Sequence, residues 1–460
     1  MKKQSGKHDA DMTQGVIWKQ LLEFTVPMGI GLIFQQFYNT VDTIVVGRFV
    51  GKEALAAVGS TGCIINMLVS LSSGLSSGST VLISQHYGAH DDKRLSNAVQ
   101  TTIFITFLLS VFITAAGILL VDPMLRFMST PDDVFGAARE YLTIYYAGII
   151  GLLFYNMGSG IMRAVGDSKR PLYFLIFSAL LNIVLDLLFV VAFKMGVAGV
   201  AYATIISQIV SAILILIVLS RTDAAYAVRW KLLKITGQEL KSILSIGLPT
   251  SVQQAITSFS NVFVQSYINI LGSACMAGWP AYGKLDAFVL VPMQAIALAS
   301  STFVGQNYGA NQFSRARKGT NVSLALSEII TIILGIFVMI FAPTLMLLFT
   351  QDPEVISYSV LFIRIITPFY VCNCVNQIYA GALRGIGSAM IPTVVMLLSF
   401  VAFRQVFLFF NKFFFAGTPT YTYGVSLAYP SGWVMCTVLM LIFYRRSILF
   451  KKQDGKPADR

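Results

Sequence analysis

Gln85-His86-Tyr87-Gly88-Ala89 returns later in the chain as Gln306-Asn307-Tyr308-Gly309-Ala310, at a constant offset of 221 residues. Other residues recur at the same offset: Arg94 as Arg315, Arg163 as Arg384, Gly166 as Gly387 and Pro171 as Pro392. The chain is therefore expected to fold as two similar halves. In a membrane chain, such duplication is typical of transporters, because two repeats supply two bodies that can move around a central site.

The composition of the 460 residues is that of a membrane protein. The chain is 56% apolar and only 12% charged, with a mean hydropathy of +0.72. A soluble protein of this length needs far more charge to cover its surface. About 20 apolar residues cross the hydrocarbon core as a helix, whereas barrel strands would alternate over about ten residues, a pattern that this chain lacks.

The sequence predicts an all-α membrane protein with twelve transmembrane helices, six in each half. The predicted spans centre near Ile33, Val69, Phe107, Ile149, Val184, Ala212, Val262, Pro292, Leu334, Tyr370, Val401 and Val438. The predicted organisation is an N-terminal tail (1–15), an N-lobe (16–220), a linker (221–238), a C-lobe (239–447) and a C-terminal tail (448–460). The polar start leads into an apolar segment too long for a cleavable signal peptide.

The net charge of +12 orients the chain rather than pointing to nucleic acid. Most basic residues lie before the first span, between the halves, after the last span and in loops on that same side. The positive-inside rule then places both termini and the linker in the cytoplasm. The five cysteines lack metal-ligand spacing and are interpreted as packing residues: Cys63, Cys275, Cys372, Cys374 and Cys436.

Few ionisable residues fall inside the predicted spans, so each is informative. Asp42 lies late in the first span, and Asp186 lies in the fifth, four residues after Asn182 on the same helix face. An unpaired carboxylate in hydrocarbon is costly and must face water, a partner or a cation. Two nearby carboxylates form a plausible proton site, and the same oxygens with an amide and a hydroxyl suit sodium. The alternative for Asp42 is a position near the membrane surface, where it caps or solvates the helix.

The second half has no equivalent carboxylates, because the positions 221 residues beyond Asp42 and Asp186 are Phe263 and Phe407. Its spans offer amides instead, which either line a cavity or join helices as interhelical hydrogen bonds. The cavity candidates from both halves are Gln35, Tyr38, Asn156, Gln254, Asn261, Gln265, Asn373, Asn376 and Gln377. Asp286, two residues after Lys284, is expected to form an ion pair near the start of the eighth helix.

Pro27 in the first span has a partner in Pro249 of the seventh span. A proline inside a helix frees a backbone carbonyl and bends the helix. Because Pro27 and Asp42 share a helix, bending could follow the charge of that carboxylate, which would make Pro27 a hinge. The alternative is a static kink.

Several motifs together resemble the multidrug and toxic compound extrusion (MATE) family over nearly the whole chain. They are Pro27, Tyr38-Asn39-Thr40-Val41-Asp42 with Val46-Gly47-Arg48, the paired Gln-x-Tyr-Gly-Ala segments, Arg163-Ala164-Val165-Gly166-Asp167 with Pro171, Leu181-Asn182-x-x-Leu185-Asp186, Gly196-Val197-x-Gly199-Val200-Ala201-x-Ala203-Thr204, and Leu383-Arg384-Gly385-x-Gly387 with Pro392. Their order and spacing in both halves carry the resemblance.

The resemblance implies an antiporter of the cell membrane, with two six-helix lobes in a V around a central cavity. It would export organic, often cationic and amphipathic compounds in exchange for protons or sodium ions, as a monomer in the lipid bilayer and without another cofactor. In the bacterial-type branch that the chain is similar to, the cation site lies in the N-lobe. Its residues match Asp42, Asn182, Asp186 and Thr204, which would also be the metal ligands if sodium is the coupling ion. Other branches carry a carboxylate on the seventh helix, where this chain has Gln253 and Gln254.

Two other classes of function fit less well. A flippase for lipid-linked precursors has a related architecture, but its large anionic head group would favour an arginine cluster in the cavity, and only Arg364 and Arg404 stand out. A receptor or scaffold would need a signalling domain, and the tails and linker are too short to fold one. The sequence shows neither a nucleophile–base constellation nor a phosphate-binding glycine loop, so we expect no enzyme activity.

Overall fold

The computed structural model describes residues 10–50, 52–128 and 130–451, and every regular element in these ranges is helical. This confirms the predicted all-α class. The first-half elements are α1 (Ile17–Val45), η1 (Val46–Val50), α2 (Lys52–Gly88), α3 (Asp92–Phe127), α4 (Asp132–Ala147), α5 (Ile149–Ala164), α6 (Lys169–Asp186), η2 (Leu187–Ala192) and α7 (Gly196–Arg221).

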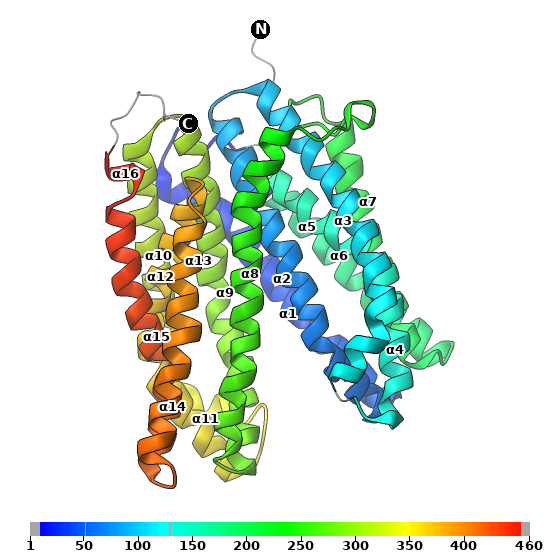
Figure 1. Cartoon of the computed structure of the whole chain (residues 1–460), viewed down its shortest axis with the longest axis vertical. Helices are drawn as coiled ribbons and strands as arrows, with labels where there is room; N and C mark the ends of the chain where they lie inside the picture. The colour runs from blue at the N-terminus through cyan, green and yellow to red at the C-terminus, as the bar shows by residue number, and fades with distance from the viewer. Residues whose placement is uncertain (1–9, 51, 129, 452–460) are drawn as a thin grey trace. The chain divides into compact units, whose positions relative to one another are not determined.

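The remaining elements begin with the short turn that connects the halves. They are η3 (Trp230–Leu232), α8 (Gly237–Asn269), α9 (Ser273–Gly309), α10 (Phe313–Met346), α11 (Pro353–Ile366), η4 (Thr367–Phe369), α12 (Tyr370–Gly385), α13 (Met390–Leu397), η5 (Leu398–Phe403), α14 (Arg404–Phe415), α15 (Pro419–Arg445) and α16 (Ile448–Lys451). Figure 1 shows these helices coloured along the chain.

Ten helices in the described ranges are long and apolar enough to cross a membrane, or eleven when α4 and α5, bent by 47° at their junction, count as one span. All twelve predicted centres fall within helical segments. The helix around Val262, α8, is not among the ten, because polar residues such as Gln253, Gln254 and Asn261 lie in the middle of its apolar stretch. The count of twelve spans stays a prediction.

Helix α3 buries a row of hydroxyl side chains and exposes large apolar ones, as expected for a helix surrounded by lipid. On α3, Thr102, Thr106 and Ser110 are buried, while Phe112 and Leu119 are exposed. Hydroxyl groups can turn inward because they donate to carbonyls one turn back on the same helix, as Thr106 does to Thr102 at 2.7 Å. The large exposed apolar side chains then fit a hydrocarbon surrounding.

This hydroxyl stripe is itself duplicated. Helix α10 buries Ser323, Ser327 and Thr331, which lie 221 residues after the hydroxyl residues of α3. The helix also turns a row of isoleucines outward, including Ile333 and Ile340. The repeat seen in the loop motifs therefore continues inside the helices, where small hydroxyl residues allow close helix packing.

The chain divides into two compact units, whose division falls within two helices. One unit contains Val26–Ser251 and the other contains the residues from Val252 onward. The segment Met12–Thr25 belongs to the second unit, although it leads directly into the first. Helices α1 and α8 therefore each pass from one unit to the other, close to Pro27 and Pro249. The predicted division into an N-lobe and a C-lobe did not include this exchange of chain segments. The boundaries of the predicted lobes stay a prediction.

Candidate functional site

Three of the four predicted coupling residues lie on the paired helices α6 and α7. Ser178 Oγ donates to the carbonyl of Ser207 at 2.7 Å, and a methyl group added at Gly199 would lie 3.1 Å from Phe189 Cβ. Since residue numbers rise on one helix as they fall on the other, the helices are antiparallel. One helical turn from the Ser178–Ser207 contact, Asn182 and Thr204 lie at the same level.

All three side chains are buried: Asn182 is 1% exposed, Asp186 is 0% exposed and Thr204 is 4% exposed. Asp186 is the last residue of α6, immediately before the π-helical segment η2, and such segments often occur at functional sites. Thr204 Oγ1 donates to the carbonyl of Val200 at 3.0 Å, which leaves its oxygen able to accept. A carboxylate, an amide and a hydroxyl on one buried helix pair can hold a proton or a hard cation.

The fourth predicted residue, Asp42, and the cavity candidate Tyr38 are part of α1, but their side chains lie outside the described residues. Gln35, on the same helix, is exposed. The arrangement of Asp42 relative to Asp186 therefore stays a prediction.

The amide candidates have different surroundings. Asn376 is buried on α12 and joins α15, because its Nδ2 donates to the carbonyl of Trp433 at 3.0 Å and its Oδ1 accepts from Thr437 at 3.0 Å. Asn156 and Gln265 donate within their own helices, to the carbonyl of Leu152 and to Asn269 Oδ1. The contacts of Asn376 fit the interhelical alternative, whereas those of Asn156 and Gln265 join no helices.

Asn261 on α8 fits the prediction of a cavity-lining residue better than these amides do. It is exposed, and its Oδ1 accepts from Arg404 Nη2 at 2.9 Å and from Tyr429 Oη at 3.2 Å. The other amide candidates make no such network in the described part of the chain: Gln254 and Gln377 are half-buried, and Asn373 is buried.

The expected ion pair of Asp286 is wrong. Asp286 lies inside α9 rather than at its end, and its Oδ1 accepts hydrogen bonds from Tyr282 Oη at 3.1 Å and from Tyr370 Oη. Tyr282 and Asp286 are one turn apart on α9, and Tyr370 reaches them from α12. Sequence reasoning missed this cluster because Lys284, two residues away, suggested an ion pair, whereas the partner Tyr370 lies 84 residues away on another helix. The available signal was a run of aromatic residues, Trp279 and Tyr282, at helical spacing before the carboxylate.

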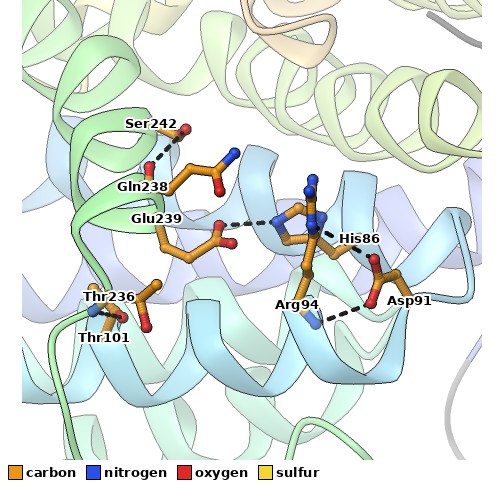
Figure 2. Close-up of polar contacts among 8 residues, drawn as sticks. All are labelled: His86, Asp91, Arg94, Thr101, Thr236, Gln238, Glu239 and Ser242. Atoms are coloured by element: carbon orange, nitrogen blue, oxygen red, sulfur yellow. Dashed lines mark hydrogen bonds and ion pairs between the residues drawn. The ribbon is translucent and has the colours of Figure 1, made fainter. Parts of the chain in front are cut away.

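The first copy of the repeated motif, residues 85–89, has a clear structural role. His86 Nε2 lies 2.9 Å from Glu239 Oε2 and joins the end of α2 to the start of α8 (Figure 2). Both side chains are buried, with 6% and 3% exposed. Next to this pair, Asp91 accepts from the backbone N–H of Arg94 and caps α3. The motif therefore fastens α8 to the unit that contains α2.

In the second half the same motif fastens the segment before α1. Gln306 Oε1 accepts from the backbone N–H of Met12 at 2.9 Å, and Asn307 Nδ2 donates to the Met12 carbonyl at 3.2 Å. Arg315 donates to the Gly15 carbonyl and to Gln20 Oε1, each at 2.9 Å. The two copies of the motif thus bind the chain segments at the start of α1 and α8, the two helices that pass from one compact unit to the other.

A repeated bundle of apolar helices with a buried carboxylate and hydroxyl stripes defines a membrane protein of the transporter class. Comparison with known families makes this specific: the model of the MatE family matches residues 27–188 and 249–410, one match in each half. The chain belongs to this family, which confirms the resemblance to the MATE family, and its place in the bacterial-type branch with an N-lobe cation site stays a prediction. The two matches begin at Pro27 and Pro249, the prolines near which the helices change unit.

Individual relatives agree with the family model. The chain is 29% identical to a probable multidrug resistance protein, YoeA, of Bacillus subtilis, over 95% of each chain. It is 31% identical to a second one, YpnP, over 86% of this chain and 89% of that protein. Among solved structures, it resembles an outward-facing multidrug resistance MATE family transporter with a TM-score of 0.91 and 25% identity, over 98% of this chain and all of the other.

Proposed function

We propose that the chain is a secondary active antiporter that exports organic, cationic and amphipathic compounds across the cell membrane in exchange for protons or sodium ions. The observation that carries the proposal is the fully buried Asp186 beside Asn182 and Thr204, in a chain of the MatE family. A carboxylate is kept at membrane depth at a cost of several kcal/mol and is therefore expected to have a functional role.

The proposed coupling site comprises Asp42, Asn182, Asp186 and Thr204. Binding of a proton or a sodium ion there would compete with the exported compound, because both favour the same carboxylates. A ligand shifts a conformational equilibrium only through its different affinity for the two states. Mutual exclusion of ion and substrate therefore makes the exchange obligatory.

The finer architecture belongs to the same proposal. It comprises twelve spans in two six-helix lobes in a V around a central cavity, with both termini in the cytoplasm and the protein acting as a monomer. The positive-inside distribution of lysine and arginine supports the orientation. No nucleic acid and no further cofactor takes part.

The flippase alternative is weaker because its arginine cluster has no support among the described residues. Arg364 is exposed on α11, whereas Arg404 is buried and donates to Ser260 and Asn261. The relatives described above are also named for multidrug resistance. Proteoliposomes that receive a dye cation and, separately, a lipid-linked precursor distinguish the two functions: the proposal predicts movement of the dye alone, and movement of the lipid alone would refute it.

Pro27→Ala is expected to slow transport without removing substrate binding. The proline interrupts the backbone hydrogen bonds of α1 at the point where the helix passes between units, and alanine restores a straight, stiffer helix. Initial rates of dye efflux from proteoliposomes and equilibrium dye binding measure the two effects separately. Pro123→Ala inside α3 is the matched control, and it should leave the rate unchanged. An unchanged rate in Pro27→Ala would mean that the kink is static.

A further inference from the structure

The buried face of α6 returns in the second unit, the one with the residues from Val252 onward, with a shift of one residue. Three buried residues follow one another on each face: Ser178, Asn182 and Asp186 in the first unit, and Ser399, Arg404 and Leu408 in the second. Each step is four residues long, except that from Ser399 to Arg404, which is five. This longer step spans the end of the π-helical segment η5, where hydrogen bonds join residues five positions apart.

Arg404 is therefore the structural counterpart of Asn182. By the offset of 221 alone, the counterpart would be Phe403. The exposed fractions of the two side chains decide between them, because Arg404 is 3% exposed and Phe403 is 37% exposed. The π-helical turn thus brings an arginine to the buried position at which the first unit has the amide of its proposed coupling site.

The helices that pack against these faces also correspond. In the first unit, Ser178 Oγ donates to the carbonyl of Ser207 on α7 at 2.7 Å. In the second unit, a methyl group added at Gly432 on α15 would lie 2.9 Å from the carbonyl of Ser399. Ser207 and Gly432 therefore lie at the same level of the two repeats.

Three residues before this level, α7 carries Thr204 and α15 carries Tyr429. Thr204 belongs to the proposed coupling site, and Tyr429 lies beside Arg404, with its ring centre 4.5 Å from the guanidinium carbon. Arg404 and Tyr429 therefore occupy, in the second unit, the places of Asn182 and Thr204 in the first.

Neutral groups surround the Arg404 guanidinium. Its Nη2 donates to Ser260 Oγ and to Asn261 Oδ1 on α8, each at 2.9 Å. Tyr429 Oη donates to the same Asn261 oxygen at 3.2 Å. Among the described residues, Arg404 forms no ion pair, and its buried Nε–H has no acceptor. The arginine thus brings a whole positive charge into a span without a carboxylate to neutralise it.

Such a guanidinium has the surroundings of a bound cation. Oxygen atoms and the face of an aromatic ring are the groups that hold cations in proteins. Unlike a carboxylate, which can take up and release a proton, a guanidinium stays charged. A charge inside a span without a counter-ion costs free energy, so its presence indicates a function.

We propose that Arg404 is a fixed cation, which takes in the second unit the place that the coupling ion takes in the first. The second unit then keeps one charge state while the first takes up and releases its ion. Arg404 acts by holding α8 against α14 and α15, which makes it a positioning residue for transport. This inference rests on the proposed ion-coupled export and adds that only one of the two repeats responds to the ion.

The first test compares the charge of Arg404 with its hydrogen bonds, as initial rates of gradient-driven dye efflux from proteoliposomes. Arg404→Gln keeps a donor for Asn261 but removes the charge, and it should lower the rate about tenfold. Arg404→Lys keeps the charge and should retain most of the rate. Arg364→Gln is the matched control, because Arg364 is exposed on α11 and should not affect efflux.

A wild-type rate in Arg404→Gln overturns the proposal, as does an equal loss in Arg404→Lys and Arg404→Gln. If Arg404→Gln cannot be purified in a folded state, Arg404→Lys decides the question alone. Folded Arg404→Lys with efflux supports a role of the charge, and folded Arg404→Lys without efflux refutes it.

Chemical rescue of Arg404→Ala is the second test. Alanine leaves a space of the size of the lost guanidinium, which a free guanidinium ion can enter. Millimolar guanidinium chloride should raise the unfolding temperature of this variant and restore its efflux, because a ligand that binds the folded state stabilises it. Urea, a neutral molecule of nearly the same size and shape, should do neither. Equal effects of guanidinium and urea, or no effect of guanidinium, overturn the proposal.

The outcome for Arg404 is separable from that for the export function. If wild-type efflux ignores both proton and sodium gradients, ion-coupled export is refuted. The unfolding temperature of Arg404→Ala then still shows whether its site prefers guanidinium to urea, because that measurement needs no gradient. If wild-type efflux follows a gradient and Arg404→Gln follows it at the same rate, only the role of Arg404 is refuted.

Discussion

Asp186→Asn is expected to reduce gradient-driven efflux to the level of protein-free liposomes. Asparagine has nearly the same volume and can keep hydrogen bonds at this fully buried position, but it neither takes up a proton at physiological pH nor carries the charge that sodium needs. Without a change in charge, ion binding no longer distinguishes the two conformations, and the gradient cannot drive exchange. Asp42→Asn should have the same effect.

The measurement is the initial rate of dye efflux at equal protein content, checked by size-exclusion chromatography of each variant. Asp122→Asn is the matched control, because this carboxylate forms a partly exposed ion pair with Arg139 at 2.7 Å and should not affect transport. Gradient-dependent efflux by Asp186→Asn at the wild-type rate would exclude Asp186 from coupling.

Glu239→Ala is expected to lower the stability of the folded protein by about 3 kcal/mol. The substitution leaves the buried His86 without the partner that lies 2.9 Å away, and it also releases the start of α8 from the end of α2. Removing one member of a buried pair costs much more than removing an exposed one, because the remaining group stays desolvated. Thermal unfolding in detergent, followed by loss of the monodisperse peak, measures the effect.

Two further variants test this explanation. Glu239→Gln keeps an acceptor for His86 and should lose clearly less stability than Glu239→Ala. Arg94→Ala removes the partly exposed ion pair with Asp91 at 3.7 Å and should have little effect. Equal stability of Glu239→Ala and the wild type would mean that the pair does not hold α8.

Most of the fold could be predicted from the sequence because membrane solvation leaves a strong pattern. Long apolar runs between basic loops predict helices, and all twelve predicted centres fall within helical segments. The repeat at offset 221 also reached further than the loop motifs suggested, since Thr102, Thr106 and Ser110 on α3 correspond to Ser323, Ser327 and Thr331 on α10. A hydroxyl residue at every fourth position can be recognised in a sequence. These two rows do not stand out, because serine and threonine also occur at many other positions of the chain.

Other features depend on contacts between distant parts of the chain and could not be predicted. Nothing near His86 in the sequence indicates Glu239 as its partner, because 153 residues separate them. The exchange of chain segments between the compact units likewise depends on where Met12 and Thr236 dock, with Met12 bound to Gln306 and Thr236 bound to Thr101. Helix periodicity specifies which residues share a face, and it does not specify the helix that covers that face.

The candidate site illustrates the same limit. The residues Asn182 and Asp186 share a face by their spacing alone, and the pairing of α6 with α7 brings Thr204 to the level of Asn182. Asp286 was misread because its partner Tyr370 lies on another helix, 84 residues away. A carboxylate next to a basic residue in the sequence therefore need not form an ion pair with it in the fold.

Efflux of a fluorescent organic cation from proteoliposomes, under separately imposed proton and sodium gradients, tests whether export is coupled to an ion through Asp186. The proposal predicts that one of the two gradients accelerates efflux from liposomes with the wild-type protein, and that Asp186→Asn abolishes this acceleration. Efflux that ignores both gradients, or acceleration that persists in Asp186→Asn, would contradict ion-coupled export through the buried carboxylate.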